Sequence, residues 1–510
     1  MNFLKAGMHK LPEYMQLRQA VESNALPAVA TGLSGIHKAT IINALVQDTN
    51  KTALLLAADE AEAQRICQDL TSMGLRSFIY PTRDFTFRNV ESASREYEHQ
   101  RIQVLSRILK HDCDVVVACM DAALQYTIPP NELEGRMIEL KKGQTVSLEQ
   151  VVQSLVRCGY VRAEQIDGTG QFAVRGGILD FFTPDAPYPV RIEFWGDEID
   201  TIGLFDLESQ RRTETVDAIM LAPSVEVLVD NPSELADKIE KHASSLRGKT
   251  APKAKEILQM ECDQLRNGRH FHCADKYITM LYDRTATLLD YFSLNDTLVF
   301  VSEFHKGKER IRTTQWQWAE DVKEYLEEGV LCRGLDTYSG DWIYIQSQLE
   351  KRSTVCLEAF VRGTYEVPVR TLLNITARQL SVWGGSIALL EEDLQAMQSS
   401  GLTCIVLGGT EKTASNIATD LKEKGLSVVY MPDMSEIPDK GVIITTGTLS
   451  AGMEFPAAGF GIITHGRHTG KAAAKKRKNK HAQELYSLSE LTVGDYIVHA
   501  SHGIGVFEGI

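Results

Sequence analysis

Alternating apolar and polar positions between residues 172 and 206 predict adjacent β-strands. In the clearest run, Val190, Ile192 and Phe194 alternate with Arg191, Glu193 and Trp195. Successive strand side chains point to opposite faces, so one face would be buried and the other exposed. The exposed face would carry Arg191 and Trp195, with Arg175 ending the preceding run. Arginine and aromatic side chains are favoured at interface centres. The pattern thus suggests a docking face, although an ordinary half-buried hairpin with solvated charges gives the same alternation.

The flanking segments alternate apolar strands with amphipathic helices. Continuous apolar runs at 52–57 and 114–119 follow the pattern of buried strands, and helical periodicity covers 59–73 and about 95–109. Such βαβ alternation predicts a parallel sheet. A further buried strand at 298–305 would return to it. The expected fold class is therefore multidomain α/β, with a β-rich insert at 140–222 between the two parts, 1–139 and 223–367, of one domain.

The last third of the chain predicts three shorter units. Strands and a helix between 368 and 465 indicate a small α/β domain. A stretch at 466–488 contains a basic cluster at 471–480, for which a solvated linker is favoured and a phosphate contact is the alternative. Residues 489–510 contain two glycine turns between short strands, which predict the start of a small β-barrel.

Bulk composition excludes several classes of protein. The 510 residues carry a net charge of −14, which argues against a chain that coats DNA through its overall field. No long apolar run or signal-peptide pattern is seen, so a cytoplasmic protein without membrane contact is expected. Nine scattered cysteines without a CxxC pair predict no metal site. Residual nucleotide binding, local DNA binding and the oligomeric state stay open.

A strand, glycine loop and helix near the N-terminus have the layout of a phosphate-binding loop without its chemistry. Gly32 and Lys38 match that motif, but His37 replaces its second glycine and Ala39 replaces its magnesium-binding hydroxyl. The 298–305 strand ends in Ser302-Glu303, whereas helicase-like motors use Asp-Glu to hold magnesium and orient water. The degenerate nucleotide site predicted here comprises Gly32, Gly35, His37, Lys38, Ala39, Ser302 and Glu303. We expect the helicase-like fold without catalytic residues or a bound cofactor.

Residues 172–206, with these degenerate motifs, resemble the UvrB-like module shared by UvrB and the bacterial transcription-repair coupling factors. The resemblance implies that this domain binds UvrA through Arg175, Arg191 and Trp195, the last often Phe in the family. Residues 78–105 are too short for the tyrosine-rich hairpin with which UvrB probes DNA damage. The resemblance therefore favours the coupling factors over UvrB.

The final segment, LTVGDYIVHASHGIGVFEGI, resembles the first strands of the CarD-like domain that binds the RNA polymerase β subunit. The family resemblance implies the N-terminal portion of a coupling factor, an adaptor that recruits UvrA to lesion-stalled polymerase. It also implies an ATP- and magnesium-dependent translocase, which contacts DNA, beyond residue 510. The alternative hypothesis is a catalytically active UvrB-like or helicase-like DNA-repair enzyme.

Overall fold

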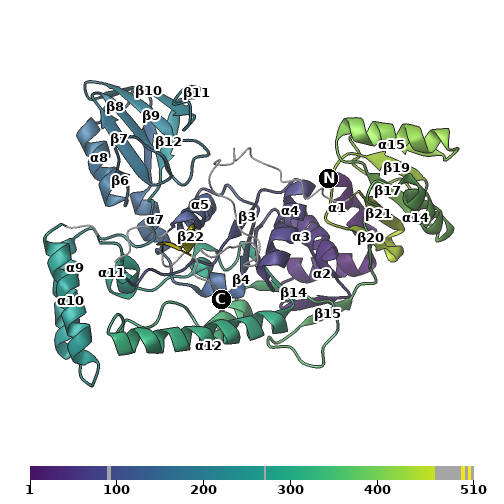
Figure 1. Ribbon diagram of the computed structural model, residues 1–510. Coiled ribbons are helices and arrows are strands. Elements are labelled where there is room, and N and C mark those ends of the chain that lie inside the picture. Colours follow the sequence, from purple (N-terminus) through teal and green to yellow (C-terminus); the bar gives the residue numbers. More distant parts are fainter. Residues whose placement is uncertain (89–93, 269–270, 466–495, 500–502, 507–510) are drawn as a thin grey trace.

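A seven-stranded parallel sheet forms the centre of the protein. The computed structural model describes residues 1–88, 94–268, 271–465, 496–499 and 503–506 (Figure 1). In spatial order the strands are β15 (Thr371–Asn374), β1 (Ala28–Thr31), β14 (Ser353–Leu357), β13 (Thr297–Ser302), β2 (Thr52–Ala57), β4 (Val115–Cys119) and β3 (Ser77–Tyr80). All neighbouring pairs are parallel. The predicted parallel-sheet α/β class is confirmed.

Helices cover this sheet and connect its strands. The predicted helix at 59–73 is α4 (Glu60–Met73), which Asp59 caps by accepting from the Glu62 amide. The helix predicted near 95–109 is α5 (Glu96–Leu109). The remaining α-helices of this part are α1 (Asn2–His9), α2 (Pro12–Glu22), α3 (Gly35–Thr49), α6 (Met120–Leu124), α7 (Pro130–Arg136), α9 (Pro232–Ser245), α10 (Ala251–Arg266), α11 (Ile278–Leu281), α12 (Phe304–Glu328) and α13 (Trp342–Glu350).

The β-rich insert projects from one end of the central domain (Figure 1). Its sheet has the order β11 (Arg212–Val216), β10 (Glu198–Phe205), β9 (Val190–Trp195), β8 (Ile178–Phe181), β7 (Gln171–Arg175) and β6 (Val161–Arg162). One face packs against α8 (Leu148–Arg157) around a core that includes Val151, Leu155, Phe172 and Ile192. Strands β5 (Ile138–Lys141) and β12 (Ala218–Leu221) pair antiparallel where the chain enters and leaves the insert.

The small α/β unit shares a hydrophobic core with the central domain. Its sheet has the order β16 (Arg378–Leu380), β20 (Gly452–Phe455), β21 (Phe460–Thr464), β17 (Thr403–Leu407), β19 (Val442–Thr445) and β18 (Val428–Tyr430), with α14 (Ile387–Ser399) and α15 (Glu411–Glu423) beside it. Leu407, Phe455 and Phe460 belong to the same buried cluster as Ile36 and Leu55. This sheet begins later than the predicted boundary at residue 368, because β15 pairs with β1 in the central sheet.

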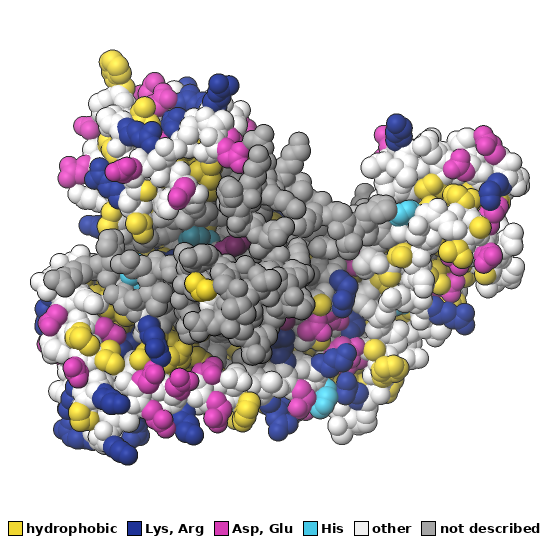
Figure 2. Space-filling view, in the orientation of Figure 1, with side chains coloured by type: hydrophobic (Ala, Val, Ile, Leu, Met, Phe, Trp, Pro, Cys, Tyr) yellow, Lys and Arg dark blue, Asp and Glu magenta, His cyan; other side chains and the backbone are white. Residues whose placement is uncertain are grey.

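The last described elements are β22 (Tyr496–His499) and β23 (Gly503–Val506), which pair antiparallel as expected for the start of the predicted barrel. The predicted basic linker at 466–488 lies outside the described residues. Within the described part of the chain, no helix is long and apolar enough to cross a membrane. Figure 2 shows acidic and basic side chains interspersed over the visible described surface.

A network of buried charges joins α5 to the segment that leaves the insert. Arg101 donates to both carboxylate oxygens of Glu226, at 2.6 and 3.2 Å. Glu98 accepts from the Glu226 amide at 2.8 Å, and Arg83 donates to Asp275 at 3.1 Å. Burial raises the pKa of Glu98. Because a buried charge is costly without a partner, this network fixes the exit of the insert against the central domain.

Replacing Arg101 with alanine should therefore lower the free energy of unfolding by about 3–5 kcal/mol, the usual cost of orphaning a buried partner. Arg76→Ala is the control, because Arg76 forms exposed ion pairs with Asp112 and Asp114 and its loss should cost less than about 1 kcal/mol. Urea unfolding measures both. Equal small losses of unfolding free energy in the two variants would show that the buried network stabilises the fold no more than exposed ion pairs do.

Candidate functional site

The outer face of the insert sheet is organised in cross-strand rows. One row contains Arg175, Ile178, Glu193 and Thr201, which are successive partners across β7, β8, β9 and β10. Trp195 follows on the same face because it lies two residues beyond Glu193 on β9. The two-residue turns before Ile178 and after Trp195 begin with Gly176 and Gly196, at φ +61° and +63°, values that favour glycine.

The end of this face near the turns is open to solvent. Trp195 is 84% exposed, and Ile178 is also exposed. Arg175 is exposed and donates to the backbone oxygen of Glu164 at 3.1 Å, so most of its guanidinium donors stay available. An exposed tryptophan and arginine beside an apolar side chain match the composition of interface hot spots. We call Arg175, Ile178 and Trp195 the exposed face.

Arg191 lies on the same side of the sheet but is already engaged. Its Nε and Nη2 donate to the two carboxylate oxygens of Asp180, at 2.7 and 2.8 Å. The hydrogen bond to Asp180 raises the pKa of Arg191. The guanidinium also lies over the Phe205 ring, 4.5 Å from its centroid. Sequence alternation correctly gives the side of the sheet, but the partner carboxylate on β8 depends on strand register.

The phosphate-loop remnant is closed by the segment that follows β15. The Ile375 carbonyl oxygen lies directly against Gly32, in the space where a side chain would begin. His37 accepts from the Ser34 amide through Nδ1, at 3.2 Å, and its Nε2 donates to the Arg378 carbonyl oxygen at 3.1 Å. His37 thus caps its own helix and ties the loop to the small α/β unit. A phosphate would have to displace these contacts to use the loop amides.

Lys38 is buried among protein partners instead of facing a ligand space. Its ammonium donates to Glu303 Oε1 at 2.8 Å, Ser302 Oγ at 2.9 Å and Glu62 Oε1 at 3.3 Å, and the residue is 2% exposed. Burial would raise the pKa of Glu303, but Lys38 holds it below its usual value. The two predicted motif remnants, at Lys38 and at Ser302-Glu303, are thereby brought together. Glu62, from α4, was not predicted because nothing in its local sequence distinguishes it.

The other predicted loop residues have structural positions. Gly35 begins α3. Ala39 is fully buried in the core, and the neighbouring hydroxyl of Thr40 donates to the Ile36 carbonyl oxygen at 2.9 Å. No hydroxyl is therefore offered from this helix to a metal at the position that the phosphate-loop motif requires.

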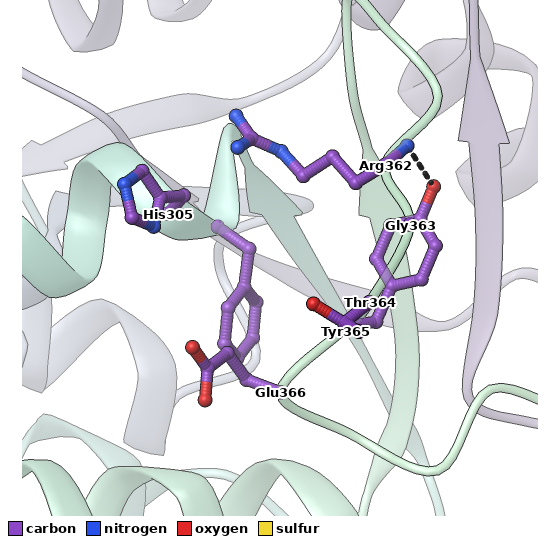
Figure 3. A pocket seen from close by; sticks show the side chains of 7 residues that line it. His305, Arg362, Gly363, Thr364, Tyr365 and Glu366 are labelled. Atoms are coloured by element: carbon purple, nitrogen blue, oxygen red, sulfur yellow. Dashed lines mark hydrogen bonds between the residues drawn. The ribbon is translucent and has the colours of Figure 1, made fainter.

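A pocket of about 400 Å³ opens beside this site, at the start of α12 (Figure 3). It is lined by Phe304, His305 and residues 362–366. Arg362 donates to Glu358 Oε2 at 3.2 Å, and its backbone amide donates to the Tyr365 hydroxyl at 3.1 Å. Glu358 in turn accepts from the Phe304 amide at 2.8 Å, so the protein itself supplies the anion at this helix N-terminus.

The fold and the site together define a parallel-sheet α/β protein that carries an inserted β-rich domain and a phosphate-loop remnant closed by the protein's own contacts. Residues 138–226 match the UvrB interaction domain, and residues 491–510 match the CarD-like/TRCF RID domain. The transcription-repair-coupling factor of Bacillus subtilis is 29% identical over 496 residues, which is 94% of this chain. That of Staphylococcus epidermidis is 25% identical over 501 residues, again 94% of this chain.

The chain is thus similar to transcription-repair-coupling factors over 94% of its own length, and it spans 42% of the length of these relatives. A solved structure, S. tokodaii Xpd4, covers 84% of this chain and 80% of its own at 10% identity, with a TM-score of 0.23. That likeness is too weak to support an argument.

Exchanging Lys38 for methionine should cost about 3–5 kcal/mol of unfolding free energy, because Glu303 and Glu62 would lose their buried cation. Adding Glu303→Gln should recover part of the loss, since one orphaned charge is removed. The control is Lys424→Met, which breaks an exposed ion pair with Glu391. Chemical denaturation gives the free energy of unfolding of the parent and of the three variants. A Lys38→Met variant as stable as the control would refute the buried pairing.

Acid should destabilise the chain as the pH falls from about 6.5 to 5. Burial lowers the pKa of His37 and of His99 to about 4, against 6.5 for an exposed histidine. Between pH 6.5 and 5 the unfolded chain therefore binds protons that the folded chain does not. The free energy of unfolding has its full value above pH 6.5 and decreases as the pH falls below 6.5. His37→Gln should reduce the slope by up to about 1.4 kcal/mol per pH unit, measured by urea unfolding across the interval. An unchanged slope would contradict a neutral, buried His37.

Proposed function

We propose that this chain acts in transcription-coupled DNA repair as a non-catalytic adaptor that recruits UvrA to RNA polymerase stalled at a lesion. The observation that carries the proposal is the exposed face, Arg175, Ile178 and Trp195, which lies within the segment matching the UvrB interaction domain. Apolar surface is unfavourable in water, so covering an exposed tryptophan with a partner protein is favourable. The family resemblance indicates that this partner is UvrA.

The match at 491–510 supports RNA polymerase as the second partner, through its β subunit. An adaptor needs two attachment points held by a stable body, and the central domain with its continuous core can serve as that body. ATP-driven translocation on DNA, with magnesium, would belong to the remaining length of the coupling factors. We propose no nucleotide chemistry for the residues of this chain.

The alternative, an active UvrB-like or helicase-like enzyme, is less favoured by the site geometry. A working phosphate loop leaves its lysine free to reach the β- and γ-phosphates. Here Lys38 is neutralised by Glu303 and Glu62 at 2.8 and 3.3 Å. Binding a nucleotide would require the ammonium to leave two carboxylates, and Ser302 would still provide no carboxylate for magnesium.

The purified chain should show no magnesium-dependent ATP hydrolysis above the rate of a Lys38→Ala variant, which removes the one motif cation. Phosphate release under saturating ATP measures this. The folding of the variant is checked by circular dichroism, because Lys38 is also a structural residue. Turnover by the parent that the variant loses would establish the enzyme hypothesis instead.

Trp195→Ala and Arg175→Ala should each weaken UvrA binding by at least about 2 kcal/mol if they are hot-spot residues, roughly a thirtyfold rise in Kd. Both side chains are exposed, so neither change should alter stability much. Matched controls are Val156→Ala and Arg157→Ala, which change exposed residues on α8, across the sheet from the exposed face. Calorimetry with purified UvrA gives the affinities. Equal losses in variants and controls would point to another surface.

A further inference from the structure

Asp180 and Arg191 form a closed pair beneath the outer face of the insert. Asp180 is 3% exposed, and the side chain of Arg191 is 21% exposed. The two oxygens of the carboxylate and two nitrogens of the guanidinium meet in the parallel, bidentate geometry that gives the strongest arginine–carboxylate pairs. Both partners sit directly opposite each other on β8 and β9. The planar fork of Arg191 is thereby used within the domain.

The same arginine also holds the turn between β10 and β11. Its Nη1 donates to the Gln210 carbonyl oxygen at 3.4 Å, and its plane covers Phe205 at the end of β10. Gln210 has φ +56°, a left-handed conformation that a residue with a side chain rarely adopts without support. Phe205 lies in a small buried cluster with Ile166 and Ala173. Arg191 therefore connects three strands and one turn.

Arg175 differs from Arg191 in each of these respects. It is exposed, it pairs with no carboxylate of the described residues, and it donates to one backbone oxygen. A protein partner could pair with Arg175 without breaking anything. To pair with the Nε–Nη2 edge of Arg191, the same partner would have to displace Asp180 and leave that carboxylate buried and alone, which is strongly unfavourable. The other edge of the guanidinium faces Gln210, which accepts from Nη1 at 3.4 Å.

We propose that Arg191 and Asp180 are positioning residues for UvrA binding, and that the partner is contacted by Arg175, Ile178 and Trp195. The proposal rests on the proposed function of this domain. Asp180 holds Arg191, and Arg191 holds β9 and the β10–β11 turn, so that Trp195 projects from a strand of fixed register. Ile178 takes part because it is exposed between Arg175 and Glu193 in the same cross-strand row.

The decisive experiment measures UvrA affinity for Asp180→Asn, Arg191→Gln, the double variant of these two, and Arg191→Lys. Asp180 is too buried to touch a partner, yet its change should weaken binding about tenfold or more, as Arg191→Gln should. The double variant replaces the ion pair with two neutral amides and should bind at least about threefold better than Arg191→Gln alone. Arg191→Lys keeps the charge but not the fork, so it should remain impaired.

Two results would overturn the positioning role: parental affinity in Asp180→Asn, or a double variant that binds no better than Arg191→Gln. The latter would mean that Arg191 contacts UvrA itself. Ile178→Ser tests the added contact and should weaken binding about tenfold while leaving thermal unfolding unchanged; parental affinity in that variant removes Ile178 from the contact.

Hydrogen exchange of the unbound chain separates this inference from the proposed function. Asp180→Asn should speed amide exchange at residues 205–211 without changing exchange in the central sheet, because the local tie is lost and the global fold is kept. Arg175→Ala, the matched control, should leave the segment unchanged. If the parent fails to bind UvrA, the proposed function fails and the positioning role for UvrA falls with it, and faster exchange then shows only that the Asp180–Arg191 pair holds the turn. If the parent binds UvrA, unchanged exchange in Asp180→Asn overturns the positioning role alone.

Discussion

A buried ammonium group requires negative charge close by, and this requirement governs the centre of the molecule. In a working phosphate loop the lysine meets the phosphates of its ligand. In this chain Lys38 meets Glu303 from the end of β13 and Glu62 from α4, with the hydroxyl of Ser302 between them. The strand ends and α3 are thus held together by protein charges alone. The charged residues of the two motif remnants therefore satisfy one another within the protein.

The same rule recurs where the insert is attached and where it presents its outer face. Arg101 is fully buried against Glu226 at the exit of the insert, and Arg191 is paired with Asp180 inside it. In each pair the arginine and the carboxylate neutralise each other, and the pair holds two backbone segments together. By contrast, Arg175 and Trp195 are left to solvent. The fold therefore separates arginines that organise the structure from one that is available to a partner, a distinction that burial reveals and residue type does not.

Sequence patterns predicted the elements whose burial is either continuous or regularly alternating. The fully apolar strand at 52–57 is β2, and the alternating run at 190–195 is β9. They failed for elements whose environment is set at long range: β15 is short and half exposed, yet it is the edge of the central sheet. The site behaves likewise. Local motifs identified Lys38 and Arg191, but their partners Glu62 and Asp180 come from other elements, and no local signal marks them.

The contacts around the phosphate-loop remnant also connect the central domain to the small α/β unit. Restoring glycine at position 37 would not reopen the loop, because the Ile375 carbonyl oxygen lies against Gly32 independently of His37. Restoring an aspartate at position 302 would add a third carboxylate around one ammonium, since Glu62 and Glu303 are already there. The segment that closes the loop also leads from the central sheet into the small α/β unit. The phosphate-loop remnant therefore lies at the joint between two units, because the same segment supplies the carbonyl oxygens of Ile375 and Arg378 that contact Gly32 and His37.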